Sequence, residues 1–541
     1  MTTRLHDHAD AVAHERIAST CAESAIRIPL LQHALLLGIA ADLLLRDPGL
    51  SFPICVALVA ASYAALAWRE ARVIEREVVF WLALGVVFAS CFAWRASDEL
   101  QFMNVVASVG SLGMAAVASA SPGAALFAKR LRDTVWAAVG AARCVALGFL
   151  PVAARAFATR DVRERTTSRV VPALRAAFIA FTILVVFGSL LRGADPLLAS
   201  LIALPDVDMG ELLSHVFVIG LFTWLVGGWA RGALAVDVSP TRAPDTLPFR
   251  FGALDVNTAL GTLIVVFAAY VASQLGWFFG GESFLHERTG LTVATYARQG
   301  FFELVTAVAL VLPVLVATRA GVPRGSRLAH RHTMLSLPLI AFLGATVISG
   351  AARMRLYVHY YGLTTDRLYP FIFMGWLALV LAWFACTVLR DWPRPFVAGT
   401  LLSGASMLAA LNVANPDLFV ARVNLGRAAH SMRTESQLDL GYLATLSGAV
   451  PLAVTATLAP INEALPTAGR CQSATELLRR WGPTSSSVVR RENAPAWRGW
   501  NADESTAIQS VGARVAALRE VVHRACAPFN PRRSVSASPG R

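Results

Sequence analysis

The stretch Leu368–Leu389 reads LYPFIFMGWLALVLAWFACTVL and contains no charged residue. A helix needs about 20 consecutive apolar residues to cross the hydrocarbon core of a bilayer, which is about 30 Å thick. In lipid the backbone N–H and C=O groups must pair within the protein, which only helices and closed barrels achieve. The stretch is long enough and apolar enough to be a helix, so it predicts a membrane span.

Further segments with the same length and composition occur along the chain. They are Ile28–Leu45, Leu50–Trp68, Val78–Trp94, Leu100–Ser119, Ala173–Leu191, Leu212–Ala230, Leu254–Leu275, Ala297–Thr318, Thr333–Ala352 and Pro395–Val413. Together with Leu368–Leu389 they predict an all-α fold, a polytopic transmembrane helix bundle of about 11 spans within residues 28–414.

The overall composition agrees with this interpretation. Of 541 residues, 56% are hydrophobic and 15% are charged, whereas soluble domains carry about 25% charged residues. The mean hydropathy is +0.55. A chain with so few charges cannot cover the surface of several soluble domains, so a large soluble protein is excluded.

The arginines predict the orientation of the bundle. The net charge is +13, and Lys129 is the only lysine among 48 basic residues. Lys and Arg are retained on the cytoplasmic side of membrane proteins. With 11 spans, the N-terminal tail and the loops on its side carry 24 basic residues, against 7 in the opposite loops. We therefore expect a cytoplasmic N-terminus and, because the span number is odd, an extracytoplasmic C-terminus. This distribution also argues against nucleic-acid binding.

Three segments lie outside the predicted spans. Residues 1–27 are polar, so we expect a cytoplasmic tail without a cleavable signal peptide. Thr134–Ala158 has only a short apolar run between Arg143 and Arg155, which favours a helix lying at the membrane interface, with a twelfth span as the alternative. Residues 529–541 are rich in Ser, Pro and Arg, a composition typical of disorder.

Residues 415–528 predict a small helical module outside the membrane, because apolar residues recur there at helical spacing. Cys471 and Cys526 are its only cysteines. On the extracytoplasmic side an oxidising compartment would allow them to form a disulfide. The alternative is that they are one buried and one exposed thiol.

The sequence carries no signature of catalysis. It has no HExxH motif, no GxSxG motif and no CxxC pair, and a phosphate-binding loop would need a lysine that only Lys129 supplies. His33 and His215 are the histidines within the predicted spans, and the topology places them at different depths. We therefore predict that the protein is not an enzyme and has no metal, haem or other cofactor.

Charged residues within or beside the spans form the candidate site, because such residues are costly in a membrane. Asp42 and Arg46, one turn apart, predict either a self-paired couple or a proton or ion site. On the outer side, the loop Arg353–Arg367 carries basic residues against the charge rule. The planar guanidinium group of arginine suits carboxylate or phosphate. Either internal ion pairs or an external anion must therefore balance the positive charge of this loop. The predicted anion- or headgroup-binding set is Arg298, Glu303, Arg353, Arg355 and Arg367, with Gln274 and Asp366 in support.

Several of these segments resemble a known family. The motifs are Gln274–Gly281, Thr289–Leu304, Arg353–Tyr369, Asn415–Asn424 with Arg427, Leu438–Leu443 and, more weakly, Ala40–Leu45. They are similar to the bacterial integral-membrane family known as domain of unknown function 4173 and to its 4153 relative, over most of Ile28–Pro451. Gly448 departs from the pattern, since the family often has an acidic residue there. The resemblance implies a bacterial inner-membrane protein and no established activity.

Two functions are favoured by the sequence, with an intramembrane enzyme as a third alternative for which no nucleophile–base pair or metal set is found. The first is a transporter- or channel-like protein with an anion or lipid-headgroup site at the outer face. The second is a non-catalytic sensor or scaffold whose C-terminal module binds an envelope partner. In the second case the basic segments Lys129–Arg132 and Arg319–His332 would meet anionic lipid inside. Membrane lipids are expected partners in both, and the small-molecule substrate is unknown.

Overall fold

Helices account for nearly all of the structure, a computed structural model. It describes residues 29–119, 131–149, 209–234, 252–289, 301–322, 325–390, 392, 394–430, 439–447, 450–451, 467–485 and 497–526. No strand occurs among these residues. The all-α prediction is confirmed for this part of the chain.

Eight of the described helices are long and apolar enough to cross a membrane. They are α2 (Ser51–Arg69), α3 (Arg76–Trp94), α4 (Asp98–Ser119), α9 (Met209–Leu234), α10 (Ala253–Thr289), α13 (Arg327–Tyr361), α14 (Thr365–Thr387) and α15 (Arg394–Ala414). The chain is therefore a multi-pass membrane protein.

Two more predicted spans correspond to shorter apolar helices, the first helix Pro29–Leu45 and the Val305–Ala320 part of α12 (Phe301–Ala320). The remaining one, Ala173–Leu191, lies outside the described residues, so a total of 11 spans stays a prediction. Residues 1–27 and 529–541 also lie outside them.

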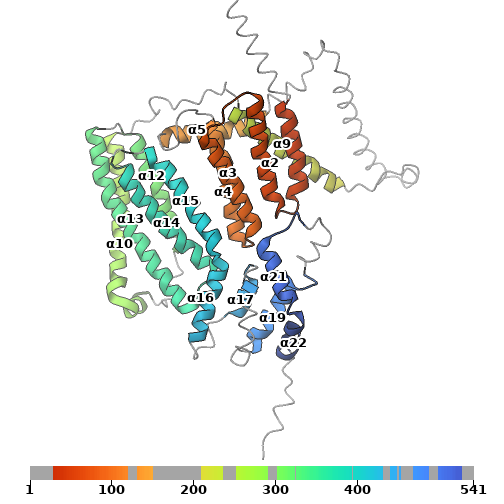
Figure 1. Ribbon diagram of the computed structural model, residues 1–541. Coiled ribbons are helices and arrows are strands. Elements are labelled where there is room, and N and C mark those ends of the chain that lie inside the picture. Colours follow the sequence, from red (N-terminus) through yellow and green to blue (C-terminus); the bar gives the residue numbers. More distant parts are fainter. Residues whose placement is uncertain are drawn as a thin grey trace, which may run out of the picture.

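The spans pack as two groups (Figure 1). The first helix, α2, α3, α4 and α9 share one hydrophobic core around Tyr63, Trp81 and Trp229. Helices α10, α12, α13, α14 and α15 share a second core around Leu343 and Phe384. Helix α15 joins the groups, because Leu408 and Leu411 pack with residues of α3 and α4.

The C-terminal helices gather at one end of the bundle, which we call the C-terminal face (Figure 1). The loop before α2 lies there, since Ser51 N donates to Arg498 O at 3.1 Å. So does the loop between α13 and α14, because Leu363 N donates to Asn424 Oδ1 at 3.0 Å. Helices α4 and α9 both end at the opposite face, where Ser119 Oγ donates to Ala233 O.

Helix α5 (Leu131–Leu147) covers part of the predicted interfacial segment Thr134–Ala158, and Figure 1 shows it lying across the neighbouring helices. Glycines on α9 allow the close approach, because a Cβ on Gly228 would lie 2.4 Å from Val145 O. The depth of α5 in the membrane stays a prediction.

The C-terminal helices are α16 (Pro416–His430), α17 (Leu440–Thr445), α19 (Thr467–Trp481), α21 (Ala502–Gly512) and α22 (Val515–Ala525). Their core contains Val420, Leu443, Leu477 and Ala507, but also Leu363 from the α13–α14 loop. A disulfide joins Cys471 and Cys526, the two cysteines considered above, and closes α22 onto α19. The C-terminal helices therefore share their core with the ends of the spans.

Helix α13 differs from the prediction in both directions. The sequence treats Arg353–Arg367 as a loop, but the helix continues to Tyr361 and the loop is only Gly362–Thr364. The aromatic residues Tyr357 and Tyr361 pack against each other at 5.1 Å and extend the helical face. The helix also begins earlier, so His332 belongs to it, buried and within hydrogen-bond distance of Thr318 and Ser336.

Candidate pocket at the C-terminal face

The length of α13 predicts that its last turns project beyond the hydrocarbon core of the membrane. Its apolar part, Thr333–Ala352, is already long enough to cross the membrane. The following residues, Arg353–Tyr361, add about 13 Å at 1.5 Å per residue. We therefore expect this end of α13 at the depth of lipid headgroups, where arginine and tyrosine side chains are favoured.

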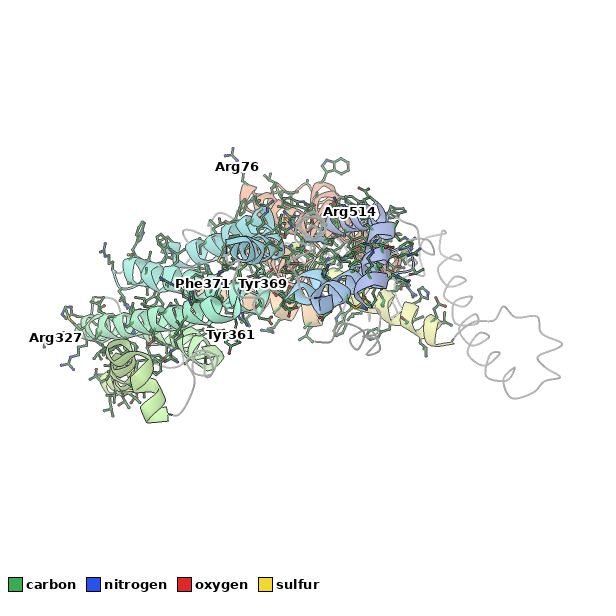
Figure 2. The ribbon with its side chains drawn as sticks, turned by 90° about the horizontal axis from the view of Figure 1, so that it is seen from below. Arg76, Arg327, Tyr361, Tyr369, Phe371 and Arg514 are labelled. Atoms are coloured by element: carbon green, nitrogen blue, oxygen red, sulfur yellow. A yellow bond between two sulfur atoms is a disulfide. The ribbon has the colours of Figure 1, made fainter. Side chains whose placement is uncertain are left out.

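A pocket with a volume of about 480 Å³ lies among the ends of α13, α14, α15 and α16. Its surface is almost entirely apolar, with Met354, Leu411 and Phe419 among the lining residues, and Arg355 and Arg367 line it almost only with apolar atoms. Figure 2 views the molecule from the C-terminal face and labels the lining residue Phe371. Apolar walls with a few polar groups are typical of small-molecule sites of this size.

Arg367 is held in place at the edge of this pocket. Its Nη1 donates to Tyr361 O at 3.0 Å and to Gly362 O at 2.5 Å, the last carbonyls of α13. Its guanidinium also stacks over the Tyr357 ring, 4.2 Å from the centroid. A cation at a helix C-terminus is favoured by the helix dipole. Gly362 makes the turn possible, because its φ of 77° is one that side chains disfavour.

Arg355, by contrast, is exposed and makes no hydrogen bond or ion pair with another described residue. Arg353 lies on the opposite side of α13, because two residues turn a helix by about 200°. Arg353 is buried and its Nη2 donates to Tyr270 OH of α10 at 3.1 Å. The structure therefore separates Arg353 from the pair that lines the pocket.

The other predicted site residues are distributed as follows. Asp366 is exposed in the first turn of α14. Arg298 lies outside the described residues, and so do the side chains of Gln274 in α10 and Glu303 in α12. In the described part of the chain, no group of three or more His, Cys, Asp or Glu side chains could hold a metal ion.

Helix α16 and the loop before α14 close the pocket from the C-terminal side. Asn424 Nδ2 donates to Leu363 O at 2.6 Å, and its Oδ1 accepts from Leu363 N. Tyr442 OH accepts from Thr365 N at 2.9 Å. Burial raises the pKa of Tyr442, so its hydroxyl stays protonated. These contacts fix residues 363–365, and through them the position of Arg367.

A family model described as domain of unknown function (DUF4153) matches residues 82–455, more than half of the chain. The chain belongs to this family. Of the two related families that the motifs resemble, the 4153 family is thus the one shown. No curated protein and no solved structure matches the chain.

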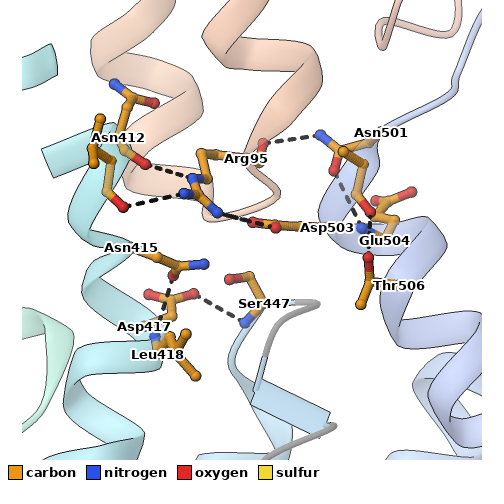
Figure 3. A network of polar contacts seen from close by, with 12 residues as sticks. Arg95, Asn412, Asn415, Asp417, Leu418, Ser447, Asn501, Asp503, Glu504 and Thr506 are labelled. Carbon is orange, nitrogen blue, oxygen red and sulfur yellow. Dashed lines mark hydrogen bonds and ion pairs between the residues drawn. The ribbon is translucent and has the colours of Figure 1, made fainter.

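The DUF4153 region contains all the helices that form the pocket, but not α19, α21 and α22. These last helices dock on it through a buried ion pair, in which Arg95 Nη1 lies 3.2 Å from Asp503 Oδ1 (Figure 3). Arg95 also donates from Nε to Asn412 O at 2.6 Å. Burial raises the pKa of Asp503, against the opposing effect of Arg95.

Amide side chains extend this polar network. Asn501 Nδ2 donates to Phe92 O and to Arg95 O at 3.0 and 2.9 Å, which binds α21 to the end of α3. Asn104 and Asn412 exchange two hydrogen bonds of 2.9 Å and join α4 to α15. Sequence reasoning missed this network. The only signal was Arg95 itself, a basic residue in one of the loops on the predicted extracytoplasmic side, where basic residues are few.

Proposed function

We propose that this DUF4153 protein is a transporter-like protein of the bacterial inner membrane that binds an anionic lipid headgroup at its C-terminal face. The observation that carries the proposal is an apolar pocket at the end of α13 with Arg355 and Arg367 among its lining residues. The length of α13 supports a position of this pocket at headgroup depth. The role is one of binding, and no catalytic step is part of it.

The chemistry of the pocket favours an amphiphile over a free anion. A free anion gains nothing from apolar walls, whereas a lipid places hydrocarbon against them at about 0.8 kcal/mol per buried CH₂ group. Arg355 supplies an exposed cation and Arg367 a second one, already fixed by its stacking on Tyr357. Hydrogen bonds to charged groups contribute about 1.5–3 kcal/mol each, which is enough to distinguish anionic from zwitterionic lipids.

The proposed orientation places this site outside the cytoplasm. The excess of arginine in the N-terminal tail and the loops on its side supports a cytoplasmic N-terminus. The Cys471–Cys526 disulfide supports an oxidising compartment for the C-terminal helices. The lipid would then come from the outer leaflet of the inner membrane.

The experiment is a lipid-binding measurement on the purified full-length protein by native mass spectrometry. Phosphatidylglycerol, phosphatidylethanolamine and inorganic phosphate are compared for the wild type, Arg355→Ala and Arg422→Ala. Arg422 is the control, because it is an exposed arginine of α16 outside the pocket lining. We expect about tenfold weaker phosphatidylglycerol binding for Arg355→Ala, and wild-type binding for the control.

A second variant tests the apolar part of the pocket. Ala414→Trp adds a large side chain to the lining and should reduce binding of both phospholipids. Equal phosphatidylglycerol binding by Arg355→Ala and Arg422→Ala would refute the headgroup site. If the protein binds inorganic phosphate but neither phospholipid, and Ala414→Trp does not change this binding, the ligand is a free anion and not a lipid.

The alternative function is a sensor or scaffold that binds an envelope protein through the C-terminal helices. The observation that favours it is the Arg95–Asp503 ion pair, which ties helices outside the DUF4153 region to the bundle. A crosslinker placed at exposed Arg519 of α22 in intact cells should then yield one discrete product. The Cys471→Ser variant lacks the disulfide that closes α22 onto α19. If it gives the same crosslinked product, the partner does not recognise the folded arrangement of these helices.

A further inference from the structure

Asp42 is the one carboxylate of the first helix, Pro29–Leu45, and it is buried. Its residue is 4% exposed within the apolar helix Pro29–Leu45. The predicted couple with Arg46 is present, with Arg46 Nη2 at 3.4 Å from Asp42 Oδ1. A second partner comes from α9, because His215 Nδ1 lies 2.5 Å from Asp42 Oδ2. Ionisable groups within spans mark ion pathways and proton relays by default.

Glu211 completes a ring of four side chains. Its Oε1 lies 3.6 Å from Arg46 Nη1 and 3.9 Å from His215 Nε2. The imidazole thus bridges two carboxylates, the buried Asp42 through Nδ1 and the exposed Glu211 through Nε2. Two carboxylates and one guanidinium give the ring a charge of −1 when His215 is neutral, and a charge of zero when His215 is protonated. An uncompensated charge is costly away from water.

We propose that the Asp42–His215–Glu211–Arg46 ring is a proton-binding site that relays a proton between the C-terminal face and the interior of the bundle. A proton from water first binds His215 Nε2 on the Glu211 side. The proton on Nδ1 then moves to Asp42 Oδ2 along the short hydrogen bond. The imidazole is left neutral with its proton on Nε2, and Asp42 is left as a neutral acid.

The structure also places a polar group one turn further in. Gly38 precedes Asp42 by four residues, about 6 Å along the helix, and faces Thr223 of α9. A Cβ on Gly38 would lie 2.2 Å from Thr223 Oγ1, so only glycine admits this hydroxyl. Thr223 Oγ1 is buried and has no hydrogen-bond partner. Buried polar atoms of this kind are satisfied by ordered water, which would extend the path beyond Asp42.

Other titratable groups of the surrounding elements do not contact the ring. Tyr63 of α2 is bonded to Ser119, and Arg231 of α9 donates to Gly148 O. The remaining ones on the first helix, the following loop, α2, α4 and α5 are His33, Asp47, Cys55, Arg69, Asp98, Glu99, Arg132, Asp133, Arg143 and Cys144. None of the groups with described side chains forms a hydrogen bond or an ion pair with the four ring residues.

The test is pH-dependent infrared difference spectroscopy of the full-length protein in lipid nanodiscs. Asp42→Asn and His215→Gln are compared with His33→Gln and Asp47→Asn. His33 is a matched control, because it lies in the same helix but is bonded to Pro29 O of its own first turn. On acidification the wild type should show a protonated-carboxyl band together with an imidazole band.

The expected pattern is specific to the relay. Asp42→Asn removes the carboxyl band, and His215→Gln removes the imidazole band and also changes the carboxyl band, because the proton reaches Asp42 through the imidazole. Both controls keep both bands. A carboxyl band that is identical in His215→Gln and the wild type would overturn the proposal. Should Asp42→Asn fail to fold, His215→Gln decides alone, since its side chain is 34% exposed.

Discussion

At the scale of single residues, burial decides which charges matter. Arg95 and Asp503 have side chains about nine-tenths buried, and each is the other's ion-pair partner. Glu476 and Arg479 form a closer ion pair in α19, at 2.5 Å, but the Arg479 side chain is 70% exposed. Removing one partner of a buried pair leaves an uncompensated charge, whereas an exposed pair contributes little.

We therefore expect Arg95→Met to lower stability by about 3–5 kcal/mol, and Glu476→Gln by under about 1 kcal/mol. Thermal unfolding of the purified protein in nanodiscs measures both.

The pH dependence of stability tests the environment of Asp503. Because burial raises the pKa of Asp503, folding favours its neutral form. The stability that this group contributes therefore falls as the pH rises through the pKa of Asp503 in the folded protein. The wild type should therefore gain stability relative to Asp503→Asn on acidification. A constant difference between them at all pH values would contradict this account.

At the scale of elements, glycine determines how closely two helices approach. Gly228 of α9 faces α5, where an added Cβ would lie 2.4 Å from Val145 O. Gly220 of the same helix has no atom within 4 Å of such a Cβ. The two glycines thus separate the packing effect from the backbone effect of glycine in a helix.

Gly228→Ala should destabilise the α5–α9 contact by about 1–3 kcal/mol, because backbone cannot move aside as a side chain can. Gly220→Ala should be neutral or stabilising by up to about 1 kcal/mol, because alanine favours helix. Thermal unfolding again measures both variants. Equal effects would mean that α5 does not pack on α9 as described.

The disulfide acts on the pairing of α19 with α22. Cys471 and Cys526 are 55 residues apart, so the bond limits a long loop in the unfolded chain and contributes about 4 kcal/mol in the chain-entropy model. Reduction, or Cys526→Ser, should open α22 and increase protease cleavage after residue 485 while the spans stay protected. Unchanged cleavage would show that packing alone holds these helices.

At the scale of the whole molecule, the helix directions predict the sides of the membrane. A single cysteine introduced at Arg519 should react with a membrane-impermeant maleimide in intact spheroplasts, and one at Arg327 should not, because α22 lies at the C-terminal face and α13 begins at the opposite face (Figure 1). The native cysteines outside the disulfide, Cys21, Cys55, Cys91, Cys144 and Cys386, are first replaced by alanine. Labelling of Arg327→Cys alone would show that the orientation is the reverse of the predicted one. Equal labelling of both variants would contradict the prediction that the two residues lie on opposite sides of the membrane.

The sequence by itself determined the candidate spans that the structure describes, because spanning depends on local length and hydropathy. The predicted Val78–Trp94 and Pro395–Val413 differ from α3 and α15 by only one or two residues. It also identified Arg355 and Arg367 as unusual charges. It did not place the end of α13, since Arg353, Tyr357 and Tyr361 are as compatible with a loop as with a helix that projects beyond the lipid.

Only the tertiary structure decided which charges are partners. Asp503 follows Arg95 by 408 residues and His215 follows Asp42 by 173, and no local pattern links residues so far apart. Their pairing depends on which helix ends meet at the C-terminal face. The opposite positions of Arg353 and Arg355, one against Tyr270 and one at the pocket, depend likewise on the helices that pack against each side of α13. Hydropathy fixes how deep a residue lies, but packing fixes its neighbours.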